Sequence, residues 1–247
     1  MKTQNIEIKT TDGICDSYIA YPGNDKYPAV LLYMDAFGPR PYLYEMAQKL
    51  AAEGYFVLVP NLFYRVKKAP VVDLKFPLQM QDMPEAFKTL GPLFQTFSAE
   101  NALRDAGVFL DFLAQQKNVA SALVGATGYC MGGTLAIRTA ARYPNRIAAA
   151  ASYHAGNLAS EAPDSPHRLL KEIKSELYVA HADNDQSMPP EQIKRFREAL
   201  EGSHMKFKAE LYEGAAHGFT MADLPAYNKA ALERHWDSLF DLLDRAL

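Results

Sequence analysis

Apolar residues follow two alternating patterns along this chain. Short runs such as "AVLLYM", residues 29–34, are apolar at every position, which is typical of strands buried on both faces of a sheet. Longer stretches repeat apolar residues at helical spacing. Strands are predicted at Ile6–Thr10, Ile14–Tyr21, Ala29–Met34, Tyr55–Val59, Ala122–Gly128, Ile147–Tyr153, Glu176–Ala182 and Lys206–Tyr212. Helices are predicted at Tyr42–Glu53, Ala99–Gln116, Gly132–Arg142, Pro190–Glu201 and Leu224–Arg245. The alternation predicts an α/β fold, a mainly parallel central sheet with helices on both faces.

One segment, residues 61–97, breaks this rhythm. It contains four prolines and would leave the sheet at the C-terminal end of a strand. A connection this long inside a compact domain is usually a lid or a binding loop. We therefore expect this excursion to help wall the active site, with a short helix near Met83–Leu93. A surface insertion without such a role is the alternative.

Composition limits the classes of function. The 247 residues are 49% hydrophobic and 22% charged, as expected for one large globular α/β domain. A net charge of −3 gives no sign of nucleic-acid binding, which needs a clustered basic face. The sequence has neither the apolar region of a signal peptide nor the roughly 18 apolar residues that span a bilayer. A cytoplasmic protein is expected, whose two cysteines remain thiols.

The sequence "GYCMGG", residues 128–133, puts Cys130 between a predicted strand and a predicted helix. This G-x-C-x-G pattern has the form of a nucleophile elbow, a sharp turn that exposes the nucleophile at the sheet edge. The glycines let strand and helix approach closely, and the helix N-terminus favours a thiolate over a thiol. The other cysteine, Cys15, lies in a predicted strand and is expected to be a buried small hydrophobe. Cys130 is therefore the candidate nucleophile.

A thiol nucleophile needs a base and an acid that orients the base, following it in chain order. The stretch "HADNDQSMP" offers Asp183 or Asp185 after one predicted strand, and "GAAHGF" offers His217 after another. Most other histidines lie in polar surroundings or in strands, and none forms a metal-binding pair such as H-E-x-x-H. His154 is different because it ends a central strand at the same edge, so it is expected to line the pocket.

Together, "MDAFG", "LFYR", "GYCMGG", "DNDQSMP" and "AAHGF" resemble the dienelactone hydrolase family. Members of that family have the α/β-hydrolase fold and a cysteine nucleophile, and the resemblance covers nearly the whole predicted scaffold. It implies Cys130, Asp185 and His217 as a catalytic triad. It favours Asp185 because the family's acid stands four residues before a proline, here Pro189. Asp183 would then be a turn-capping residue.

The resemblance also implies roles for the loop after the first central strand. The family has an acidic residue there, usually glutamate, that holds the proton of the resting thiol and moves when substrate arrives. Asp35 occupies this position and is one methylene shorter than glutamate. The backbone N–H groups of Ala36 and Met131 would form the oxyanion hole.

Two arginines hold the substrate carboxylate in the best-known members of the family. The first matches Arg65, but the position of the second, four residues after the histidine, is Met221. A thioether cannot replace a bidentate arginine, so a dienelactone or another small anionic lactone is less expected, while ester cleavage is still expected. Further substrate contacts are expected from Met221, Phe37, Tyr64, Tyr129 and His154.

The resemblance implies a hydrolase of the carboxymethylenebutenolidase type, which would cleave a lactone or small carboxylic ester through a thioester acyl-enzyme. Neither a cofactor nor a metal is expected. The expected partner is a small-molecule substrate, with no nucleic acid and no membrane, and the chain would be a monomer or a small homo-oligomer. Two alternatives stay open: a non-catalytic member that binds a small ligand or a protein, and a thiol-based redox protein.

Overall fold

The computed structural model describes all 247 residues, and its strands form one eight-stranded sheet. The strands are β1 (Lys2–Thr10), β2 (Gly13–Tyr21), β3 (Tyr27–Tyr33), β4 (Phe56–Pro60), β5 (Val119–Tyr129), β6 (Ile147–Tyr153), β7 (Glu176–Asn184) and β8 (Phe207–Ala216). Their order across the sheet is β1-β2-β4-β3-β5-β6-β7-β8. The pairs β1·β2 and β2·β4 are antiparallel, and every later pair is parallel. The predicted fold class is confirmed.

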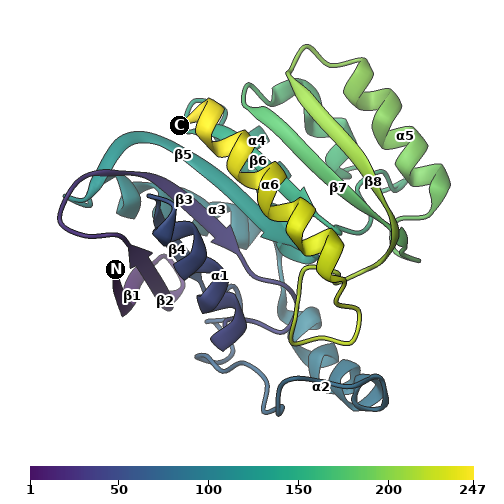
Figure 1. The fold of residues 1–247 in the computed structure, drawn as a ribbon, viewed down its shortest axis with the longest axis horizontal. Helices are drawn as coiled ribbons and strands as arrows, with labels where there is room; N and C mark the ends of the chain where they lie inside the picture. The colour runs from purple at the N-terminus through teal and green to yellow at the C-terminus, as the bar shows by residue number, and fades with distance from the viewer.

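Helices cover both faces of the sheet. They are α1 (Pro41–Ala52), α2 (Met83–Thr96), α3 (Ala99–Ala114), α4 (Met131–Arg142), α5 (Pro190–Glu201) and α6 (Lys229–Ala246), with short 3₁₀ helices η1 (Met80–Asp82) and η2 (Pro166–Glu172). Figure 1 shows α1 and α6 in front of the sheet, while α3 and α4 lie behind it, and α5 contacts η2 beside α4. None of the helices is long and apolar enough to cross a membrane.

The final helix begins later than the sequence predicts. Its pattern predicts a start at Leu224, whereas α6 starts at Lys229. Asn228 caps the helix, because its side chain accepts a hydrogen bond from Ala231 N at 3.1 Å. Residues 217–228 therefore form a loop between β8 and α6, which we call the histidine loop.

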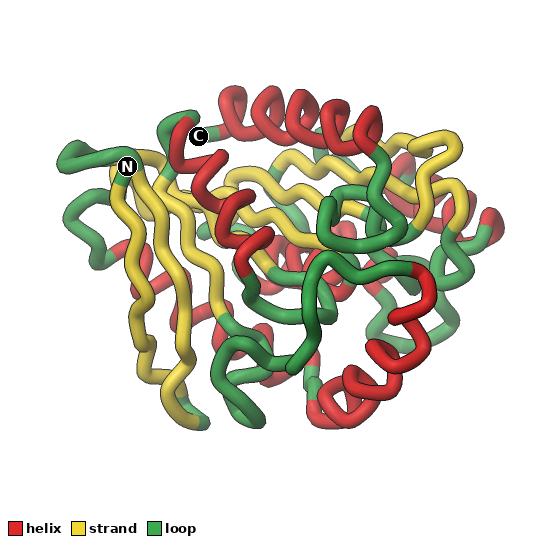
Figure 2. Tube along the Cα trace, turned by 60° about the horizontal axis from the view of Figure 1, so that its bottom comes forward, coloured by secondary structure: helices red, strands yellow, loops and turns green.

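The excursion leaves the sheet after β4 and carries η1 and α2. It lies beyond the C-terminal ends of the parallel strands, next to the histidine loop, as Figure 2 also shows. One backbone hydrogen bond, from Leu78 N to Asp223 O at 3.0 Å, joins the two segments. Loops after parallel strands gather at one edge, so the two segments enclose the edge where ligands bind in such folds.

Buried histidines lie between the sheet and its helices. His235 on α6 is fully buried, and its Nε2 lies 3.0 Å from the hydroxyl of Tyr129. His181 on β7 packs edge-on against Phe196 of α5. Burial disfavours the charged imidazolium, so it lowers the pKa of His235 to about 3 and that of His181 to about 4.

Because of His235, the folded protein is expected to lose stability as the pH is lowered. Its folded-state pKa lies below the unfolded value near 6.5, so between pH 6.5 and 5 only the unfolded chain binds the proton. The stability present above pH 6.5 is therefore lost as pH falls, by about 2 kcal/mol at pH 5 for one such imidazole. Urea unfolding of wild type and His235→Phe at pH 7.5 and pH 5 measures this. The loss between the two pH values should be about 2 kcal/mol smaller in the variant; an equal loss would contradict the assignment.

Candidate active site

Cys130 sits on a strained turn between β5 and α4. Its backbone has φ 55° and ψ −120°, a conformation that residues with a Cβ rarely adopt. A Cβ on Gly128 would lie 2.1 Å from the carbonyl oxygen of Gly132, and one on Gly132 would lie 2.3 Å from that of Met34. Glycine is thus required where strand and helix meet. The turn leaves Cys130 partly exposed at the sheet edge, as expected of a nucleophile elbow.

His217 and Asp185 approach this turn from two other loops. His217 Nδ1 lies 2.7 Å from Asp185 Oδ2, and Asp185 Oδ1 accepts hydrogen bonds from the N–H and hydroxyl of Ser187 at 2.8 and 2.6 Å. The Asp185 side chain is nearly buried, while that of His217 is about one-third exposed. Asp183 instead accepts a hydrogen bond from Gly214 N of β8 at 3.0 Å, a contact between neighbouring strands.

The pKa values of this pair are shifted in opposite directions. Burial acts to lower the pKa of His217, but the charge of Cys130 and the hydrogen bond to Asp185 outweigh it and raise the pKa to about 10. Burial acts to raise the pKa of Asp185, but hydrogen bonds from His217 and Ser187 hold it below its usual value. Asp185 is therefore an ionised acceptor for the proton on His217 Nδ1. The other ring nitrogen, Nε2, is then the one that can exchange a proton with the thiol.

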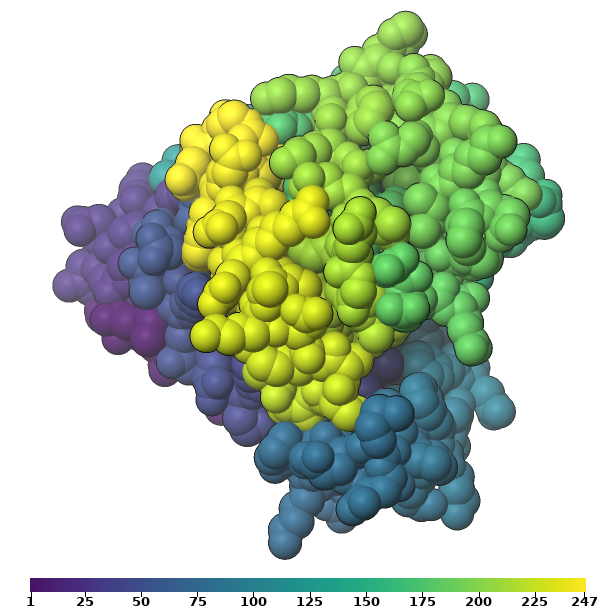
Figure 3. All heavy atoms as spheres, turned by 45° about the vertical axis from the view of Figure 1, so that its right-hand side comes forward, coloured from purple at the N-terminus to yellow at the C-terminus, as the bar shows by residue number.

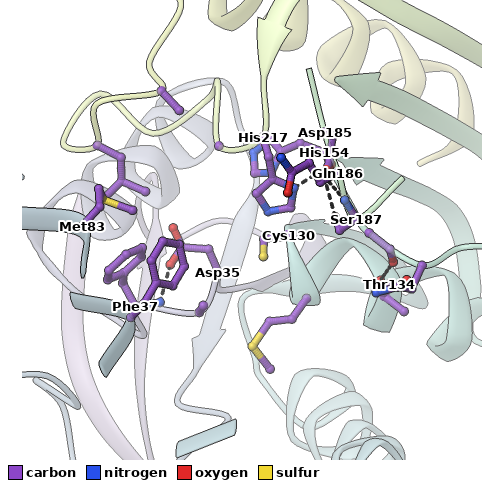
Figure 4. Close-up of a pocket in the computed structure, with 18 of the residues that line it drawn as sticks. Asp35, Phe37, Met83, Cys130, Thr134, His154, Asp185, Gln186, Ser187 and His217 are labelled. Atoms are coloured by element: carbon purple, nitrogen blue, oxygen red, sulfur yellow. Dashed lines mark hydrogen bonds and ion pairs between the residues drawn. The ribbon is translucent and has the colours of Figure 1, made fainter. Parts of the chain in front are cut away.

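Cys130, His217 and Asp185 line one pocket of about 630 Å³. Figure 4 shows the sulfur of Cys130 below the imidazoles of His217 and His154, with Asp185 beside them. The pocket lies between the excursion and the histidine loop, which meet at the surface in Figure 3. Of the residues predicted to contact substrate, Phe37 and His154 also line it, as do Ala36 and Met131.

Two backbone N–H groups are available at the pocket. Met131 is the first residue of α4, so its N–H precedes the first hydrogen bond within the helix. The N–H of Ala36 has no acceptor within the protein, whereas the next N–H, of Phe37, donates to Asp35 Oδ1 at 3.0 Å. These two free donors are the ones that the sequence proposes for an oxyanion hole.

Asp35 does not reach the thiol. Its Oδ1 and Oδ2 accept hydrogen bonds from Arg40 Nη1 and Nη2 at 2.6 and 2.8 Å, and Figure 4 shows its carboxylate turned away from Cys130. Arg40 also donates from Nε to Asp223 Oδ2 at 2.6 Å. The gating role implied by the resemblance is thus corrected: Asp35 anchors its own loop to the histidine loop through Arg40. All three side chains of this cluster are nearly buried.

His154 is a neutral member of the pocket. Its Nε2 lies 2.7 Å from Thr220 Oγ1, and its ring meets that of His217 edge to face, with centroids 5.3 Å apart. Burial and then the charge of His217 lower its pKa well below the usual value. His154 therefore packs against the base without carrying a charge of its own.

Arg65 and Tyr64 lie outside the pocket, contrary to the sequence prediction. Arg65 pairs with Asp12 and Asp105, with Nε 2.9 Å from Asp12 Oδ2 and Nη1 2.7 Å from Asp105 Oδ2. The hydroxyl of Tyr64 lies 2.6 Å from Thr10 Oγ1. Both side chains tie the start of the excursion to the first hairpin and to α3, so the guanidinium is not free to bind a substrate.

Tyr129 and Met221 are also absent from the pocket lining. Tyr129 is the last residue of β5, and alternate side chains of a strand face opposite sides. Its ring lies beneath α6 and its hydroxyl meets His235. Met221 is fully buried in the histidine loop. Their predicted contact with substrate is corrected to core packing.

Several lining residues were not identified from the sequence. The excursion contributes Met83, Phe87, Phe94 and Phe97, and the histidine loop contributes Leu224, Pro225 and Ala226. The apolar residues of the excursion at helical spacing were the available signal. Arg40, which pairs with the lining residue Asp35, gave no signal in the sequence, because its other partner, Asp223, is 183 residues away. No group of three or more His, Cys, Asp or Glu side chains is arranged to hold a metal ion.

Comparisons with known proteins all identify relatives in one family or with the same fold. The family model described as "Dienelactone hydrolase family" matches residues 15–247. The carboxymethylenebutenolidase of Pseudomonas putida is 26% identical over 248 residues, which cover 98% of each chain. The solved structure named m3DLH is 25% identical, with a TM-score of 0.79 over 100% of this chain and 98% of its own. A crystal structure from Klebsiella pneumoniae shares the fold, with a TM-score of 0.84 at 19% identity over 98% of this chain and 97% of its own.

Proposed function

The chain belongs to the dienelactone hydrolase family, a family of hydrolases, and from this premise we propose that it cleaves a carboxylic ester or lactone with Cys130 as nucleophile. His217 would be the base and Asp185 the residue that orients it. One observation carries the proposal: a cysteine at φ 55° shares a pocket with an imidazole whose Nδ1 is 2.7 Å from a carboxylate.

Acylation begins from a thiolate at Cys130 and an imidazolium at His217. The sulfur of Cys130 attacks the carbonyl carbon, and the electron pair of the C=O bond moves to oxygen. The N–H groups of Ala36 and Met131 stabilise this oxyanion. Its collapse breaks the ester C–O bond, and His217 gives its proton to the departing alkoxide.

Deacylation returns the site to its starting state. Neutral His217 takes a proton from water, whose oxygen attacks the thioester carbonyl. Collapse of the second oxyanion breaks the C–S bond and releases the acid. The thiolate of Cys130 and the imidazolium of His217 are then restored. Because the thiolate must stay reduced, we also propose a cytoplasmic location, where thiols are kept reduced.

The acyl-enzyme itself tests the proposal. A hindered activated ester, 4-nitrophenyl trimethylacetate, should acylate Cys130 faster than water removes the acyl group. Acid quenching and mass spectrometry should then find one trimethylacetyl group on the peptide that contains Cys130, with a matching burst of nitrophenolate. Cys130→Ala should show neither.

Other outcomes would favour the alternatives. Nitrophenolate release without an adduct on Cys130 would reject the cysteine mechanism. Absence of turnover from wild type would favour the non-catalytic binding role. Absence of turnover together with ready oxidation of Cys130 by peroxide would favour a redox role.

A further inference from the structure

Apart from the imidazolium of His217, the pocket contains no positively charged group. None of its 22 lining residues is lysine or arginine, and the carboxylates of Asp35 and Asp185 are both among them. The imidazole of His217 is already paired with Asp185, and His154 is held neutral by burial. A carboxylate on the substrate would therefore leave water without gaining a partner, which is costly.

The guanidinium of Arg40, which pairs with the lining residue Asp35, is not available to a substrate. Its hydrogen bonds to Asp35 and Asp223 use Nε and both terminal nitrogens, and its side chain is about 3% exposed. Two carboxylates thus share one guanidinium, so this cluster adds net negative charge behind the pocket wall. Arg65, the residue that matches a substrate-binding arginine in the family, is paired elsewhere.

The wall formed by α2 is strongly apolar. Met83, Phe87 and Phe94 are spaced by four and seven residues, so they lie on one face of the helix and all line the pocket. Phe87 and Phe94 are 59% and 42% exposed. Large apolar side chains exposed together beside a pocket indicate a binding surface rather than core packing.

Two other segments add apolar residues to the wall. Leu224, Pro225 and Ala226 line the pocket from the histidine loop, and Phe37 lines it beside the proposed oxyanion donors. Together with α2, these residues form the apolar part of the wall, and Thr134, Asn157, Asn184, Gln186 and Ser187 form a polar part. The enclosed space of about 630 Å³ is within the usual range of small-molecule sites. The space exceeds the needs of a small acyl group.

We propose that the substrate is an uncharged ester or lactone with a large apolar group that lies against Phe87 and Phe94, and that the pocket disfavours anionic lactones. This inference rests on the proposed ester-cleaving function, but it specifies the substrate class separately. Each methylene buried on the α2 face would raise kcat/KM about fourfold, and a carboxylate at the same place would lower it about 10- to 100-fold.

Three matched esters test this preference: 4-nitrophenyl hexanoate, mono-4-nitrophenyl adipate, and methyl 4-nitrophenyl adipate. The first two have the same acyl chain except that a methyl group replaces the terminal carboxylate, and the third removes the charge by esterification. With the Cys130→Ala rate subtracted, hexanoate and the methyl diester should both exceed the anionic ester about 10- to 100-fold in kcat/KM.

A positive charge placed on the α2 wall should change the preference between anionic and neutral esters. Phe87→Arg puts a guanidinium on an exposed lining position, so the rate ratio of anionic to neutral ester should rise about tenfold. Met80→Arg is the matched control: it adds the same charge at a residue that is 73% exposed and does not line the pocket. It should leave the ratio unchanged.

The outcomes separate this inference from the proposed function. If wild type cleaves the anionic ester as fast as the neutral ones, or if Met80→Arg shifts the ratio as much as Phe87→Arg, the inference is overturned while ester cleavage stands. If wild type cleaves none of the esters above the Cys130→Ala rate, the proposed function fails. Calorimetric binding of the same esters then decides the inference: tighter binding of the neutral esters supports it, and equal or tighter binding of the anionic ester overturns it.

Discussion

Replacing Cys130 with alanine is expected to lower kcat/KM for an activated neutral ester by about 10⁴-fold or more. Removal of the nucleophile eliminates the covalent route, and only the N–H donors and substrate binding remain to accelerate attack by water. Initial rates with 4-nitrophenyl hexanoate measure the loss. His217→Ala should lose activity to a similar extent, and the double variant should be little worse than either, because the two groups act as one unit.

Cys15→Ala is the matched control for the thiol. Cys15 is fully buried in β2, and burial raises the pKa of its thiol to about 12, so it stays protonated and out of contact with the pocket. This variant should keep the wild-type rate. Loss of activity in Cys15→Ala, or a Cys130→Ala variant within tenfold of wild type, would contradict the assignment of the nucleophile.

Replacing Arg40 with methionine is expected to destabilise the protein by about 3–5 kcal/mol, because two buried carboxylates then lose their partner. Asp35 lies on the loop that carries Ala36, while Asp223 lies on the histidine loop and also accepts a hydrogen bond from Leu78 N of the excursion. The cluster thus fixes three pocket segments relative to one another. Loosening of the Ala36 loop should also lower kcat/KM about tenfold or more. Urea unfolding and ester hydrolysis measure the two effects.

Two further variants show whether burial of the charges is the cause. The triple variant Asp35→Asn, Arg40→Met, Asp223→Asn removes both uncompensated charges and should recover much of the lost stability. Arg146→Met breaks only the bridge to Asp111, a residue that is 64% exposed, and should cost about 1 kcal/mol or less. Equal losses in Arg40→Met and Arg146→Met, or no recovery in the triple variant, would contradict this account of the cluster.

The sequence predicted the secondary structure closely where the pattern is local. The strand Ile147–Tyr153 and the helix Pro190–Glu201 match at both ends, because continuous burial and helical periodicity are properties of the segment itself. The prediction failed at the start of α6, since the apolar residues of the histidine loop line the pocket instead of continuing the helix. Pattern alone does not distinguish an apolar residue facing the core from one facing a ligand.

The site was predicted unevenly for a related reason. The turn at Cys130 could be recognised because its glycines and its position after a strand are neighbours in the sequence. His217 and Asp185 follow other strands, and parallel strands end at one edge, so their approach to Cys130 could be expected. Arg65, Tyr64 and Tyr129 could not be assigned correctly, because the partners of the first two lie in the first hairpin and α3, and that of Tyr129 in α6.

Local patterns along the chain were enough to predict the fold class, the succession of strands and helices, the sharp turn at Cys130 and the residues that could serve it as base and acid. Folding of distant segments placed Asp35 against Arg40 rather than the thiol, kept Arg65 away from the pocket, and lined the pocket without lysine or arginine. The physical reason is that the partner of a charged side chain depends on contacts between distant segments, here 183 residues apart for Arg40 and Asp223, whereas turns and burial patterns arise between neighbours.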